Sequence, residues 1–115
     1  MIRSRVFQYV SFLIVAVLVT FAGAQRATTK TLTGKVLNQR DAPVPGAVVY
    51  LTNTRTRAIR TYIVRDDGAF HFPALAANTD FELYAQRGDK KSDTKTVSQF
   101  DDRPQVNINL KLDTP

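Results

Sequence analysis

Apolar and polar side chains alternate along most of the chain beyond residue 30. Apolar side chains recur every second residue at Ala47, Val49 and Leu51, and after the acidic turn Asp66-Asp67-Gly68 the pattern resumes in Phe70-His71-Phe72. A period of two places one face of a strand against a core and the other face in water. The stretch from 46 to 72 therefore predicts β-strands around a tight turn, with the glycine supplying a positive φ.

The same alternation predicts seven strands, at 31–37, 47–54, 59–65, 70–72, 81–87, 91–97 and 106–112. Short strands separated by turn residues indicate an all-β sandwich, which we expect to be antiparallel. The polar strand at 91–97 is expected at a sheet edge. Tyr62 and Val64 compete with Ile63 for the core, so the register of 59–65 stays open. Phe100, in the loop before the last strand, is expected to cap one end of the core. The side chains expected to point inward are Leu32, Gly34, Val36, Ala47, Val49, Leu51, Phe70, Phe72, Phe81, Leu83, Ala85, Val106, Ile108, Leu110 and Leu112.

The first 24 residues have the pattern of a secretory signal peptide. Arg3 and Arg5 precede an apolar stretch, which ends in Ala22-Gly23-Ala24. This pattern predicts cleavage between Ala24 and Gln25, with export to the periplasm or the medium. The compact basic start is typical of bacterial signal peptides. The alternative is an uncleaved membrane anchor, because the stretch approaches the ~20 residues that span a bilayer. Residues 25–30 are then a flexible lead-in to one domain at 31–113.

Size, cysteine content and charge narrow the class of protein further. A mature chain of 91 residues forms one domain with a small core. The sequence has no cysteine, which excludes a lipid anchor and disulfides, so sheet packing alone must hold the fold. Without Arg3 and Arg5, fourteen basic side chains face ten acidic ones, a net charge of +4. The basic residues are scattered rather than clustered, which argues against a nucleic-acid partner.

Four segments together resemble the carboxypeptidase regulatory-like domain: 32–36, 42–51, 67–75 and 81–85. The resemblance covers nearly the whole mature chain and implies a seven-stranded prealbumin-like, immunoglobulin-like or starch-binding-like sandwich. Such domains usually accompany a larger catalytic, receptor or adhesive protein, and the peptidase activity lies in a separate domain. Where the family often has Pro-Gly, this chain has Ala76-Ala77-Asn78-Thr79, and Asn78 can replace the glycine in a left-handed turn.

The residues needed for catalysis or metal binding are scarce. His71 is the only histidine and Glu82 the only glutamate, and alternation places His71 on an outer face. A general base needs a nucleophile or an orienting carboxylate nearby, so we expect no enzyme activity and no cofactor. The C-terminus also lacks the Tyr-Arg-Gly-Ser motif of the transthyretin-like hydrolase of 5-hydroxyisourate. The aspartate pairs 66–67 and 101–102 fit turns better than a metal site, and Arg87-Gly88-Asp89 fits a hairpin turn better than an adhesion motif.

Three residues form the candidate interaction surface. Val48, Tyr50 and Tyr84 point away from the expected core, and exposed apolar groups that gather together commonly mark a binding surface. The expected function is a secreted, non-catalytic accessory module that binds an envelope or extracellular protein. Carbohydrate binding is the alternative, although tryptophan is absent, and a structural role in an envelope layer is third. If this face does not bind, the loops near Asp66 and Phe100 are the next candidates.

Overall fold

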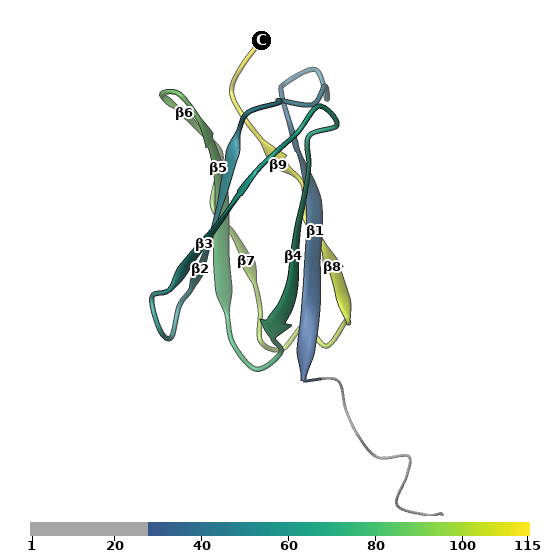
Figure 1. Cartoon of the computed structure of the whole chain (residues 1–115), viewed down its shortest axis with the longest axis vertical. Helices are drawn as coiled ribbons and strands as arrows, with labels where there is room; N and C mark the ends of the chain where they lie inside the picture. Colours follow the sequence, from purple (N-terminus) through teal and green to yellow (C-terminus); the bar gives the residue numbers. More distant parts are fainter. Residues whose placement is uncertain (1–27) are drawn as a thin grey trace, which may run out of the picture.

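A computed structural model describes residues 28–115, so the expected signal peptide and its cleavage point lie outside the described residues. Two β-sheets face each other within this part, as Figure 1 shows. The described residues contain nine strands and no helix, and accordingly no helix long and apolar enough to cross a membrane. The all-β sandwich is confirmed, with nine strands where the sequence predicts seven.

The first sheet is built around β1 (Thr29–Leu37). Strand β4 (Ala69–Ala76) pairs with it antiparallel, whereas β8 (Gln105–Asn107) and β9 (Leu110–Lys111) pair with it parallel. The expectation of a wholly antiparallel sandwich is therefore wrong for this sheet. Only a hairpin forces neighbouring strands to be antiparallel, and here the whole second sheet lies between β1 and β8 along the chain.

The second sheet has the order β3 (Ile59–Ile63), β2 (Val48–Asn53), β5 (Phe81–Arg87), and all its pairs are antiparallel. Beyond β5 lie β6 (Lys90–Lys91) and β7 (Lys95–Val97), both paired with it. The polar segment expected at an edge does lie at this edge, but as two strands. The interruption falls at buried Ser92, whose hydroxyl oxygen accepts the Ala85 N–H at 2.8 Å in place of a backbone carbonyl.

The last predicted strand is also divided, into β8 and β9. Between them the Ile108 carbonyl passes over Gly34, where an added Cβ would lie 1.8 Å from its oxygen. The Asn109 side chain accepts the Lys35 N–H at 3.1 Å, a ladder bond supplied by a side chain. Glycine at position 34 is therefore required by the close approach of the two backbones.

Strand β4 is longer than the predicted 70–72. A register shift opposite Lys30 and Leu32 marks a bulge, and Ala74 has a φ of 59°. The extra residue reverses the alternation, so that Leu75 points inward with 1% exposure. The positive φ thus falls at Ala74, and Asn78, where the sequence allows a left-handed turn, is not among the residues with positive φ.

The core lies between the sheets and contains the expected inward residues. Those that are buried and apolar are Leu32, Val36, Ala47, Val49, Leu51, Phe70, Phe72, Phe81, Leu83, Ala85, Val106, Leu110 and Leu112, with Ile108 packed against them. Val64 is also buried and Tyr62 packs on the core, whereas Ile63 is 67% exposed, which fixes the register left open by the sequence.

Two expectations about the ends of the sandwich are wrong. Phe100 does not cap the core, because its side chain is 86% exposed. The lead-in does not extend to residue 30, because β1 begins at Thr29 and Lys30 is buried. The Lys30 ammonium donates to backbone carbonyls of the loop that carries Phe100.

Candidate functional site

The outer face of the second sheet carries the residues that the sequence singles out. Tyr50 and Tyr84 are directly opposed in the β2–β5 ladder, and their rings stack with centroids 5.0 Å apart and planes 20° apart. Val48 lies two residues along β2 on the same face. All three are half-buried, and the structure thus brings the predicted surface together.

Two further residues extend this surface across β3. Ile63 is opposite Val48 and Ile59 is opposite Thr52, so both isoleucines share the face of Tyr50. Their side chains are 67% and 61% exposed, which is unusual for isoleucine. We define the outer-face patch as Val48, Tyr50, Ile59, Ile63 and Tyr84. Sequence reasoning missed the isoleucines because the register of their strand was open.

A cation borders the patch on the side of β6. The Lys91 ammonium lies 4.2 Å from the centroid of the Tyr84 ring, within the range of a cation–π contact. Across the sheet the order of strands is β2, β5, β6, so Tyr84 lies between Tyr50 and Lys91. The ring of Tyr84 is therefore in contact with a side chain from each neighbouring strand, the Tyr50 ring from β2 and the Lys91 ammonium from β6.

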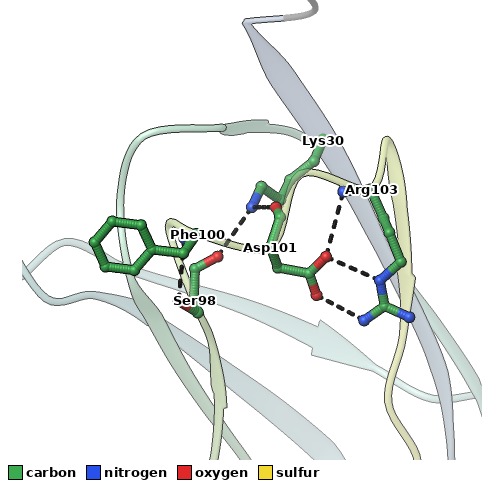
Figure 2. A network of polar contacts seen from close by, with 5 residues as sticks. All are labelled: Lys30, Ser98, Phe100, Asp101 and Arg103. Carbon is green, nitrogen blue, oxygen red and sulfur yellow. Dashed lines mark hydrogen bonds and ion pairs between the residues drawn. The ribbon is translucent and has the colours of Figure 1, made fainter.

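A second cluster holds the loop between β7 and β8 (Figure 2). The buried Lys30 ammonium donates to the Ser98 carbonyl at 3.1 Å and to the Asp101 carbonyl at 2.6 Å. The Arg103 guanidinium donates to both carboxylate oxygens of Asp101, at 2.8 and 2.6 Å. This hydrogen bonding lowers the pKa of Asp101 from 3.8 to about 2. Phe100 projects from this loop into solvent (Figure 2).

The remaining polar motifs have structural roles. An Asp67 carboxylate oxygen accepts the Ala69 N–H at 3.1 Å in a turn, and Asp101 is engaged with Arg103. Among residues 28–115, no three histidine, cysteine, aspartate or glutamate side chains come together as a possible metal site. His71 lies exposed on β4, and Gly88, with a φ of 61°, turns the chain between β5 and β6.

Several solved structures share this fold at low sequence identity. The major pilin subunit BcpA of Bacillus cereus superposes with a TM-score of 0.61 at 11% identity, over 76% of this chain and 30% of the pilin. Catechol 1,2-dioxygenase from Acinetobacter gives 0.56 at 9% identity, over 80% of this chain and 54% of the enzyme. The dioxygenase domain of a dioxygenase carbohydrate-binding protein fusion from Streptomyces superposes with a TM-score of 0.57 at 13% identity. The match covers 82% of this chain and 85% of that domain. Identities this low establish a shared fold and nothing more.

Sequence comparison is more specific about the family. Among curated proteins, none gives a significant match to the chain. The family described as "Carboxypeptidase regulatory-like domain" matches residues 31–113, which is the sandwich from β1 to just beyond β9 and agrees with the resemblance carried by the sequence motifs. The chain therefore belongs to the carboxypeptidase regulatory-like domain family.

Proposed function

We propose that this protein is an exported, non-catalytic binding module whose outer-face patch docks on a partner protein at the cell envelope or outside the cell. The observation that carries the proposal is the continuity of the patch over three adjacent strands. Ile63 and Val48 are directly opposed, as are Tyr50 and Tyr84. Ile59 and Ile63 are exposed and the other three side chains are half-buried. Apolar side chains that gather at a surface are typical of interaction sites, whereas scattered ones are not.

The absence of catalysis is part of the same proposal. The family is described as a regulatory-like domain, and the one histidine lies exposed on β4, away from the patch. The dioxygenases share the fold at 9–13% identity, which transfers no activity to this chain. A binding role needs only a stable face, and the sandwich supplies one.

Carbohydrate binding is less well supported than protein binding. A sugar ring stacks on a free aromatic face. The Tyr84 ring is stacked against Tyr50 and also contacts the Lys91 ammonium, so its faces are occupied within the protein. Isoleucines such as Ile59 and Ile63 suit the apolar centre of a protein interface better than a sugar site.

Export supports an envelope or extracellular partner and is tested separately. The basic and apolar start of the chain and Ala22-Gly23-Ala24 motivate it. N-terminal sequencing of the exported protein should begin at Gln25. Recovery of intact Met1 in a membrane fraction would instead favour an uncleaved anchor.

Serine substitutions at the stacked tyrosines test the binding role. Tyr50→Ser, Tyr84→Ser and the double variant should remain folded, because neither side chain belongs to the buried core. Each should weaken capture of the protein that co-purifies with the wild type from the producing cell, and the double variant should weaken it most. His71→Ala, on the other sheet, is the matched surface control and should capture normally. The proposal would be contradicted if the folded double variant captured the partner as well as the wild type does. It would also be contradicted if soluble oligosaccharide by itself abolished capture by the wild type.

A further inference from the structure

Strand β3 lies at an open edge of the second sheet, where it pairs with β2 alone among the described strands. Two hydrogen bonds, one at each end of the strand, show which backbone groups face β2. Asn53 N–H donates to the Ala58 carbonyl and Val64 N–H donates to the Ala47 carbonyl, both at 2.9 Å. Hydrogen-bonded positions alternate in an antiparallel pair, so Arg60 and Tyr62 also face β2.

The other three residues of β3 therefore direct their backbone groups away from the sheet. Ile59, Thr61 and Ile63 turn their N–H and C=O groups toward the edge, and all three side chains are exposed. This gives a row of donors and acceptors spaced to receive one more strand. The strand contains no proline and has an unbroken register with β2, so two common protections of an edge are missing from it.

Positive charge surrounds this edge. Arg55 and Arg57 lie in the β2–β3 loop, Arg60 lies within β3 and Arg65 follows it, and all four are exposed. In the described part of the chain none of these arginines forms an ion pair. The Arg60 guanidinium donates to the Pro73 carbonyl of β4 at 3.3 and 3.4 Å and lies 5.7 Å from the centroid of the Phe72 ring.

The acidic residues near this segment do not neutralise it. Asp66 and Asp67 follow Arg65 at the far end of the strand, and Asp67 is engaged with the Ala69 N–H. Glu82 shares the outer face two strands away, opposite Thr52. The loop that leads into β3, together with the start of the strand, is therefore basic through Arg55, Arg57 and Arg60, and it favours a negatively charged occupant.

A shallow pocket of about 240 Å³ lies beside this end of β3, between the two sheets. Arg60 and Ala58 contribute to it from the side of β3, and Ala74 and Leu75 from β4. Side chains on the inner face of a strand added to β3 would reach toward this pocket, because residues opposite one another in a sheet share a face. The pocket offers apolar contact and the guanidinium of Arg60 together.

We infer that β3 binds an extended acidic segment of a partner protein as an added antiparallel or parallel strand. The apolar side chains of the bound segment lie beside Ile59 and Ile63, and the carboxylates on the other face of that segment lie beside Arg60. A second copy of this chain fits less well, because pairing two β3 strands would bring their arginines together. The inference rests on the proposed binding role but concerns the sheet edge rather than the tyrosines, so the two can fail separately.

A blocked peptide of about nine residues, alternating valine and glutamate, is the probe for this edge. Titration of the wild type followed by NMR should give saturable binding at or below about 1 mM, which weakens as salt is added. The bound peptide should slow hydrogen exchange at the amides of Ile59, Thr61 and Ile63. Exchange at Arg60 and Tyr62, whose amides already face β2, should change little. This alternation is the signature of an added strand.

Matched variants separate strand addition from other contacts. Thr61→Pro removes an outward donor without removing a bond to β2, and should weaken binding about tenfold or more, whereas Thr61→Ala should bind as the wild type does. A peptide methylated at alternate backbone nitrogens should fail with the unaltered protein, which keeps the test valid if Thr61→Pro does not fold.

Four results would overturn the inference. The first is no saturable binding of the acidic peptide to the wild type. The second is equal binding of a peptide with lysine in place of glutamate. The third is a dimer of the wild type that Thr61→Pro converts to a monomer, which would make a second copy the occupant. Loss of partner capture in the tyrosine variants, with the Thr61→Pro variant unaffected, would leave the outer-face proposal standing and refute the edge alone.

Discussion

Replacing Lys30 with methionine removes a buried ammonium and keeps most of its aliphatic stem. The ammonium donates to the carbonyls of Ser98 and Asp101, and hydrogen bonds to a charged group contribute about 1.5–3 kcal/mol each. Water can reach these carbonyls once the ammonium is gone, because they lie in a surface loop, so the lower value applies to each. The free energy of unfolding should therefore fall by about 3 kcal/mol, a large part of the stability of a small domain.

Urea unfolding at neutral pH measures this change. With a slope of roughly 1.5 kcal/mol/M, the midpoint should fall by about 2 M and the slope should stay the same. Lys35→Met is the matched control, because Lys35 lies in the same strand with its side chain exposed, and it should be nearly neutral. A Lys30→Met variant within about 0.5 kcal/mol of the wild type would refute the reasoning, because desolvation of the ammonium would then cancel its hydrogen bonds.

Three other substitutions or titrations test the fold. Phe72→Ala should cost about 3–5 kcal/mol, because its ring is 2% exposed and packs edge-on against Tyr62, while exposed His71→Ala should be nearly neutral; equal melting temperatures would contradict this. Gly34→Ala should cost about 3 kcal/mol in urea unfolding, because the new methyl group meets a backbone carbonyl, and a variant as stable as the wild type would refute the close approach. The Asp101 carboxyl should titrate by NMR with a midpoint of about 2, which should rise in Arg103→Gln. Since this pKa lies below the ordinary 3.8, its contribution to stability is present above about pH 4 and is lost as pH falls through about 2; a midpoint unmoved by Arg103→Gln would exclude the guanidinium as its cause.

The inward positions could be predicted from sequence because alternation depends only on the geometry of a single strand. Phe70 and Phe72, or Leu83 and Ala85, need no knowledge of their neighbours to be placed inside. The interruptions could not be predicted in this way. At Ser92 a hydroxyl replaces a backbone acceptor, which depends on the position of a partner strand.

The geometry of the candidate surface could be predicted from sequence in part. Tyr50 and Tyr84 lie on the outer faces of clearly alternating strands, so the pattern predicts that they point away from the core. Their contact with each other depends on the pairing register of β2 and β5. The isoleucines of β3 were missed because both faces of that strand mix apolar and polar residues. Ile59 and Ile63 share a face with Thr61, whereas Tyr62 shares the other with Arg60. Only the pairing with β2 decides between the two faces.

The parallel pairing of β1 with β8 and β9 affects how the domain would respond to mechanical tension. The described chain enters the sandwich at one end of β1 and leaves beyond β9 at the opposite end (Figure 1). A pull between these two points acts along the strands and loads the hydrogen bonds between them in shear. Many bonds must then break together rather than one after another as in a peeled hairpin. Resistance of this kind is governed by the rate of unfolding, and it would let a small sandwich without disulfides stay folded while a tethered partner pulls on it.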